Sequence, residues 1–246
     1  KTENKNAPSE EMIFSLNDYQ FKNNAIKFIR SQKLFSFNVY SPPFNTDIFR
    51  KFIKCQNILY IELIYNQKIE IKENCFYESK NIKGIRFVSK DLNVNNFGFR
   101  NLRNVSLFHF EKLVKAKFGS NAFSGCESLQ KFEIATSSEL ELCDECFHGN
   151  INLQELKVKS PSVIIGEKGF MGCNSLSSVS FLYLKSIKIG SNAFSGCESL
   201  KELKLKVESN LEFEEYCFSR ASNLQRVEIT GIKFLIIEQG SFENCP

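Results

Sequence analysis

An eleven-residue segment, GSNAFSGCESL, occurs twice in this chain, as Gly119–Leu129 and again as Gly190–Leu200. The two copies start 71 residues apart, at residues 119 and 190, which is three times a period near 24 residues. A weaker form of the same pattern recurs along the chain. Repetition at this period predicts a solenoid, a stack of similar coils that offers a long surface rather than one deep reactive pocket. The repeat therefore favours a binding module over an enzyme.

A phenylalanine marks the same position in each repeat, and we number the other positions of the repeat from it. These structural phenylalanines are Phe52, Phe76, Phe123, Phe147, Phe170, Phe194, Phe218 and Phe242. Apolar residues recur at positions +6, +9 and +11, and a second apolar pair recurs at −7 and −5. One residue separates the members of each pair, which puts both side chains on one face of a strand. Each coil is therefore predicted to contain two short strands.

The Asn-Ala-Phe-Ser-Gly-Cys segment between these strands is predicted to form a short helical turn. Ser120 or Ser191 can cap it, and the glycine after the phenylalanine can end it. Three other glycines, Gly119, Gly166 and Gly190, recur at turns, where we expect a positive φ. Stacked coils would form parallel sheets with like residues in register around a shared core.

One repeat departs from this pattern. Its residues at +6, +9 and +11 are assigned as Leu102, Val105 and Leu107. Asn96 then stands where the phenylalanine is expected, with Phe97 and Phe99 close by. We interpret this repeat as a coil with shifted anchor residues.

The segment Ile165–Phe181 reads Ile-Gly-x-x-x-Phe-x-x-Cys-x-x-Leu-x-x-Val-x-Phe and follows Pro161-Ser162-Val163. It resembles the BspA-like leucine-rich repeat family, and the resemblance extends over residues 52–246. It implies an α/β-type repeat fold, a leucine-rich-repeat solenoid of coils near 24 residues with a parallel sheet on the concave face and short strands opposite. It also implies a non-catalytic role in binding proteins, as in surface adhesion proteins of bacteria and protists that bind matrix or other cells. A composition rich in Asn, Lys, Ile and Phe would suit a protist.

The chain is predicted to have three parts. Residues 1–11 are polar and form a disordered arm, and residues 46–246 form the solenoid, which stops in the middle of a repeat. This ending suggests a fragment of a longer protein. Residues 12–45 form an N-terminal cap or a degenerate first coil. The repeat positions are matched by Phe28, Leu34, Phe37 and Val39, whereas a helical face is matched by Phe21, Ala25, Phe28 and Ile29.

The repeat accounts for eight of the nine cysteines, five at +3 and three at −1. We expect them to be small buried thiols in a ladder, with a disulfide between stacked neighbours such as Cys173 and Cys197 as the alternative. Cys143 lies outside the pattern and is the best candidate for an exposed thiol. It forms a C-x-x-C motif with Cys146, but a second pair or suitably spaced histidines, needed for a zinc site, are absent.

Other catalytic and targeting signals are also absent from the sequence. It contains no nucleophile triad spacing, no phosphate-binding loop and no dinucleotide fingerprint, so we expect neither enzymatic activity nor a cofactor. The net charge is +4 with both signs interleaved, which makes nucleic acid an unexpected partner. No stretch approaches 18 apolar residues, so no membrane span is expected. The resemblance favours a cell-surface location; a cytoplasmic one is the alternative, because no signal peptide is seen. Asn104-Val105-Ser106 is a glycosylation sequon that matters only in a secreted chain.

The candidate binding surface follows from strand geometry. On the strand that carries +9 and +11, the residues at +8, +10 and +12 face solvent. The +10 column is predicted to be Glu62, Arg86, Ser106, Glu133, Lys157, Ser180, Lys204 and Glu228. The neighbouring +8 positions include Tyr60, Lys131, Glu155, Glu202 and Arg226. This mixed-charge ribbon is either a solubilising face of alternating charges or a polar protein-binding concavity.

Overall fold

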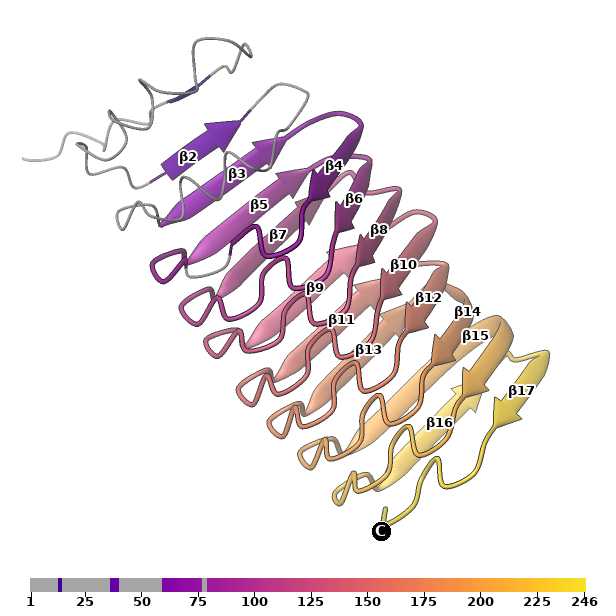
Figure 1. Ribbon diagram of the computed structural model, residues 1–246. Helices are drawn as coiled ribbons and strands as arrows, with labels where there is room; N and C mark the ends of the chain where they lie inside the picture. Colours follow the sequence, from indigo (N-terminus) through magenta and orange to yellow (C-terminus); the bar gives the residue numbers. More distant parts are fainter. Residues whose placement is uncertain (1–12, 15–35, 40–58, 77–78) are drawn as a thin grey trace, which may run out of the picture.

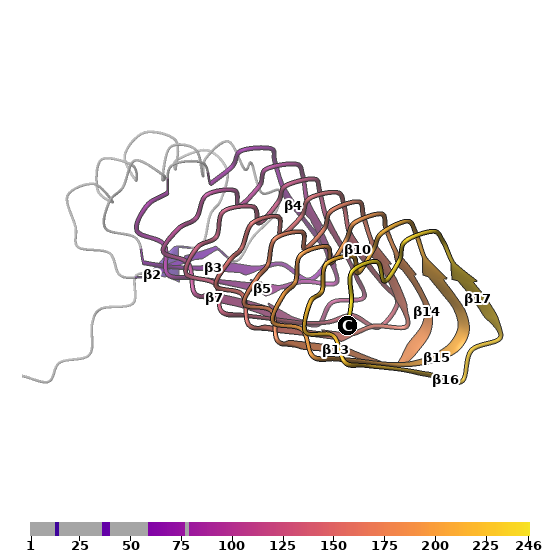
Figure 2. The same ribbon diagram turned by 90° about the horizontal axis from the view of Figure 1, so that it is seen from below.

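The computed structural model describes residues 13–14, 36–39, 59–76 and 79–246. These residues form a stack of coils along one axis, as predicted from the repeat (Figure 1). Each coil contributes one strand to each of two sheets, and turns connect the strands at both sides of the stack (Figure 2). Every hydrogen-bonded pair of strands that the structure describes is parallel.

The larger layer, here called the principal sheet, contains the strand that carries +9 and +11 of each coil. Its strands are β1 (Ile13–Phe14), β2 (Ser36–Val39), β3 (Tyr60–Ile64), β5 (Gly84–Val88), β7 (Leu107–Glu111), β9 (Lys131–Ala135), β11 (Glu155–Lys159), β13 (Ser178–Leu182), the first part of β15 (Glu202–Phe213), and β16 (Arg226–Thr230). The hydrogen-bonded ladder runs from β1 to β7 and again from β9 to β16, while β7 and β9 lie side by side without joining it.

The opposite layer, the second sheet, contains the strand that carries −7 and −5. Its strands are β4 (Lys68–Ile71), β6 (Asp91–Val94), β8 (Lys115–Phe118), β10 (Glu139–Leu142), β12 (Ser162–Ile165), β14 (Leu184–Ile189), the second part of β15, and β17 (Phe234–Ile237). The predicted pairs at −7 and −5, such as Leu140 with Leu142 and Val163 with Ile165, are buried in the core, except in the last coil, where Leu235 and Ile237 are exposed. The two sheets thus enclose one continuous apolar interior.

The phenylalanines of successive coils form a single column through this interior. From Phe123 to Phe218 these side chains are fully buried, and each ring stacks on the next with centroids 4.7 to 5.1 Å apart. The centroid spacing is close to the distance between neighbouring strands of a sheet, as expected when coils stack in register. The predicted column is confirmed for the described coils; Phe52 lies outside the described residues.

The irregular coil differs from the predicted assignment. Phe99 takes the place of the coil's phenylalanine in the column, and its ring centroid lies 5.3 Å from those of both Phe76 and Phe123. Counted from Phe99, the inward residues of β7 are Phe108 and Phe110, so the assignment of Val105 and Leu107 to +9 and +11 was wrong by three residues. The coil is complete, and its anchor is a residue that lies three positions later than expected.

No helix forms in the segments that were expected to be helical, within the part of the chain that the structure describes. Each segment is a series of turns in which alternate backbone N–H groups donate hydrogen bonds to the next coil instead of to their own. Phe123 donates its N–H to the carbonyl of Cys146 in the next coil (2.8 Å), whereas Ser124 donates to Asn121 of its own coil (3.2 Å). Left-handed residues at −2 and +2, such as Asn121 and Gly125, prevent a helix from propagating.

The recurring glycines serve two structural purposes, and the purpose expected for one group of them was wrong. Gly125, Gly149, Gly172 and Gly196, all at +2, have φ between 71° and 74°. Gly119, Gly166 and Gly190 do not have a positive φ, contrary to expectation. At these three positions a Cβ atom would lie 2.6 to 2.8 Å from backbone atoms of the preceding coil. Glycine is needed there because the chains of neighbouring coils approach closely.

Replacing Arg220 with glycine should stabilise the protein. Arg220 occupies +2 with φ 58°, a conformation that costs an L-residue about 1–2 kcal/mol. Glycine removes this cost but has greater freedom in the unfolded chain, so we expect a gain of roughly 0.5–1 kcal/mol in the free energy of unfolding. Urea denaturation measures it. Arg220→Ala is the matched control, because it removes the same side chain but keeps the Cβ; an equal gain in both variants would show that φ is not the cause.

The residue at +3 joins each coil to the one before it. The thiols of Cys126, Cys173 and Cys197 donate hydrogen bonds of 3.3 to 3.4 Å. The acceptor is in each case the backbone carbonyl oxygen of the column phenylalanine in the preceding coil. Asn150 takes the same place, and its amide donates to the Phe123 carbonyl at 3.0 Å. Cys173 and Cys197 are free thiols, so the alternative of a disulfide between them is not observed. Cysteine at +3 therefore supplies a buried donor as well as volume.

The N-terminal part is described at two short strands. β2 pairs with β3 in parallel, with Phe37 opposite Ile61 and Val39 opposite Leu63, which is the register that the repeat positions require. The polar arm 1–11 and the alternative helical face of residues 21–29 lie outside the described residues, as does the rest of the segment 12–45 apart from β1 and β2.

Candidate functional site

The outer face of the principal sheet carries the residues predicted to form the binding ribbon. Along each strand, burial alternates between the inward and outward positions, for example in β9 and β11. The +8 residues Tyr60, Lys131, Glu155, Glu202 and Arg226 lie in one outward column. The +10 residues Glu62, Arg86, Glu133, Lys157, Ser180, Lys204 and Glu228 lie in the next. The structure brings these residues together on one face.

Ser106 does not belong to the ribbon. It precedes β7, and its backbone N–H donates to the carbonyl of Lys83. The +10 place in that strand is taken by His109, which is paired in register with Arg86 of β5. The error follows from the shifted anchor, and the spacing from Phe99 to Phe108 and Phe110 was the signal that could have revealed it.

Most charges on this face are paired with a neighbour. Lys131 contacts Glu155 (3.1 Å), and Lys157 contacts Glu133 (3.0 Å). The hydrogen bond from Lys157 holds the pKa of the Glu133 carboxyl below its usual value. Such exposed pairs contribute little stability, but they leave a surface with a weak net field. The paired charges of the ribbon therefore favour solubility. Specific binding of a partner would require contacts in addition to those with the charged side chains.

A second group of paired charges surrounds Arg86. Its guanidinium bonds the carboxylates of Glu62 and Glu111, the latter at 2.8 Å through Nη2. Donation from Arg86 lowers the pKa of Glu111, to which His109 Nε2 also lies at 2.8 Å. These contacts fix the long arginine side chain in one orientation on β5.

An apolar patch lies beside this group, on the +8 positions of β3, β5 and β7. Tyr60 is 47% exposed and Leu107 is 54% exposed. Gly84 lies between them, and a Cβ there would be 3.0 Å from Cδ1 of Tyr60, so the ring covers the glycine. Tyr60 was expected on this face; Gly84 and Leu107 were missed, because Leu107 had been assigned to the interior. An exposed tyrosine next to an ordered arginine has the composition of a binding hot spot.

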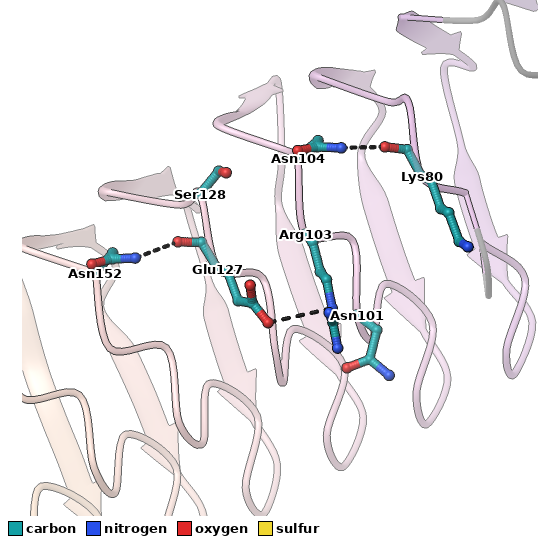
Figure 3. A pocket seen from close by; sticks show the side chains of 7 residues that line it. All are labelled: Lys80, Asn101, Arg103, Asn104, Glu127, Ser128 and Asn152. Atoms are coloured by element: carbon teal, nitrogen blue, oxygen red, sulfur yellow. Dashed lines mark hydrogen bonds and ion pairs between the residues drawn. The ribbon is translucent and has the colours of Figure 1, made fainter.

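A polar depression of about 750 Å³ lies on another side of the stack, where the turn segments lead into the principal strands (Figure 3). It is lined by Lys80, Asn101, Arg103, Asn104, Glu127, Ser128 and Asn152. Asn104 and Asn152 donate side-chain N–H groups to the carbonyls of Lys80 and Glu127, and Arg103 Nε lies 3.3 Å from a Glu127 carboxylate oxygen. These amide hydrogen bonds join neighbouring coils, which gives Asn104 and Asn152 a structural role.

The thiols are placed for packing rather than chemistry. Burial raises the pKa of Cys126 and of Cys173 to about 12, so both remain protonated at neutral pH. Cys143 is half-buried, and burial together with Glu141 raises its pKa to about 11. The expectation that Cys143 is an exposed thiol is therefore only partly met. No group of three or more metal-binding side chains occurs among the residues that the structure describes.

Comparison with known proteins found a matching family model and a similar solved structure. The model of the BspA type leucine rich repeat region, in six copies, matches residues 46–158 and 140–246. A leucine-rich repeat protein from Bacteroides ovatus is similar in structure at 15% identity and a TM-score of 0.33, covering 85% of this chain and 84% of that chain. None of the curated proteins compared shows significant similarity. In the described part of the chain, no helix has the length and apolar character to cross a bilayer.

Leucine-rich repeats of this type are protein-interaction modules. The family match extends over most of the chain and includes the coils described above. The chain therefore belongs to the BspA-type leucine-rich repeat family.

Proposed function

We propose that this chain is a non-catalytic module that binds a protein partner through the outer face of the principal sheet. The observation that carries the proposal is the apolar patch of Tyr60, Gly84 and Leu107 beside the ordered Arg86. Three adjacent parallel strands hold these residues, so little conformational freedom is lost when a partner binds. The paired charges further along the face would then form a hydrated rim.

The setting that we propose is a cell surface, with matrix proteins or the surface of another cell as the partner. The support for it is the family, together with a mixed-charge outer face that stays soluble in the absence of a partner. An intracellular scaffold is the second candidate. The free, buried thiols favour it, because oxidising compartments usually convert neighbouring cysteines to disulfides. Labelling of intact cells with an impermeant reagent distinguishes the two settings, since only a displayed protein is labelled.

Replacing Tyr60 and Leu107 together with serine should weaken binding by about 100-fold, as expected when two central apolar anchors are lost. The measurement is biolayer interferometry against matrix proteins and host-cell membrane proteins immobilised as separate pools. Lys117→Ala, an exposed position in β8 of the second sheet, is the control and should bind like the wild type. No signal from any pool with the wild-type protein would count against adhesion. Equal binding by the double variant would count against this patch.

A further inference from the structure

Tyr183 is an exposed aromatic residue in a strained backbone conformation. It forms the corner between β13 and β14, with φ 65° and a side chain that is 78% exposed. The same position in two other coils is taken by Lys112 (φ 62°) and by Gly231 (φ 79°). A bulky residue with positive φ costs free energy, and Tyr183 does not recover it by burial. Strain at a solvent-exposed aromatic therefore points to a role outside the fold.

The strand next to this corner is irregular in a way that redirects side chains. The pairing of β14 with β15 changes register between Leu184 and Ser186. β-Bulges of this kind bend a strand and reorient the residues beside it. In the next coil β15 continues around the same corner as one strand of 12 residues. Tyr183 therefore projects at a place where the regular stack is locally distorted.

Three lysines surround Tyr183, and two of them have no ion-pair partner among the described residues. Leu182, 37% exposed, is paired in register with Lys159 of β11. Lys206 follows two residues after Lys204, which is in register with Ser180, so it lies on the other side of Leu182. Lys185 is exposed two residues after Tyr183.

These lysines differ from those on the ribbon. Among the described residues, Lys185 and Lys206 form no ion pair, and Lys159 has a single long contact of 3.8 Å with Glu133. Glu208 lies near the corner in the next coil and forms no ion pair with them. The corner thus carries an excess of positive charge, three lysines against Glu208, whereas the ribbon carries matched pairs such as Lys131 with Glu155 and Lys157 with Glu133.

We propose that the Tyr183 corner, defined as Lys159, Leu182, Tyr183, Lys185 and Lys206, is a docking site for an acidic segment of a protein. Carboxylates of the segment would pair with the lysines, and one apolar side chain would pack on Tyr183 and Leu182. A tyrosine and one leucine offer too little apolar area for stable insertion into a bilayer, which favours a protein over a lipid surface. This inference rests on the proposed protein-binding function but uses a surface away from Tyr60.

The test is fluorescence anisotropy at low salt with a labelled peptide of glutamates interrupted by leucine and phenylalanine. A peptide with glutamine in place of every glutamate is the probe control. Tyr183→Gly should raise the dissociation constant of the acidic peptide about 10-fold while raising the melting temperature by about 2–4 °C, because the strain is removed. Lys112→Gly is the matched variant: it relieves the same type of strain in another coil and should leave peptide binding unchanged.

Three outcomes would overturn the inference. They are equal affinity of wild type and Tyr183→Gly for the acidic peptide, equal affinity of the acidic and glutamine peptides, and binding to phosphatidylserine vesicles but not to the peptide. The Tyr60 and Leu107 double variant separates this inference from the proposed function. It should retain peptide binding while it loses capture of matrix or cell-surface proteins, so either proposal can fail alone.

Discussion

Replacing Phe194 with alanine should lower the free energy of unfolding by about 3–5 kcal/mol, the range found when a buried aromatic is truncated. Phe194 is fully buried, with its ring centroid 5.0 Å from Phe170 and 5.1 Å from Phe218. The substitution removes both stacking contacts and leaves a cavity between two sheets that cannot collapse without breaking strand pairing. Urea denaturation measures the loss.

Lys204→Ala supplies the comparison from the neighbouring principal strand. Its ammonium group lies 2.9 Å from a Glu202 carboxylate, but both side chains are exposed, so the pair contributes little. We expect a change within about 0.5 kcal/mol of zero. Equal effects of the two substitutions would contradict the assignment of inward and outward positions, and with it the placement of the ribbon.

The repeat made the general fold predictable because stacking in register turns sequence periodicity into spatial alignment. A residue type that recurs every 23 or 24 positions, such as Phe147, Phe170 and Phe194, must lie above its equivalent if the coils share one core. Period-two pairs then identify the inward faces of both strands. Lys131 and Glu133 could be placed outside for this reason alone.

The turn conformation could not be read from residue types in the same way. Local propensity favoured a helix around Phe123, but hydrogen bonds to the next coil outcompeted it: the N–H of Phe123 is donated to Cys146. Gly119 looked like a positive-φ glycine for the same local reason. Its actual constraint is a backbone from another coil, 2.7 Å from where a Cβ would be. Both errors arise because long-range contacts decided the local structure.

The candidate site was only partly predictable. The columns of outward residues could be predicted from the periodicity. His109 and Leu107 were not predicted on the outer face, because the anchor of their coil is shifted by three residues to Phe99. The pairing of charges depends on rotamers across strands and had no sequence signal. Tyr183 was overlooked because it lies at a corner, outside the strand positions from which the ribbon was inferred.

Raising the pH above 9 should destabilise the protein steeply. The thiols of Cys126, Cys173 and Cys217 have their pKa raised to about 12 from 9.0, mainly by burial. Between these values the unfolded chain has lost the thiol protons and the folded chain keeps them. Stability is therefore fully present below about pH 9 and falls as the pH rises toward 12. Each thiol contributes a loss of about 1.4 kcal/mol per pH unit, or about 4 kcal/mol per unit for the three.

Over the three pH units between about 9 and about 12 this amounts to about 12 kcal/mol, which is most of the stability of about 5–15 kcal/mol that is typical of a domain. The measurement is urea denaturation in a reducing buffer at a series of pH values from neutral to alkaline. In Cys173→Ala the stability at neutral pH should fall because volume is lost, yet its decline with pH should be shallower by about 1.4 kcal/mol per unit. If wild type and Cys173→Ala decline with the same slope, the buried thiol ladder is not what makes the fold sensitive to alkali.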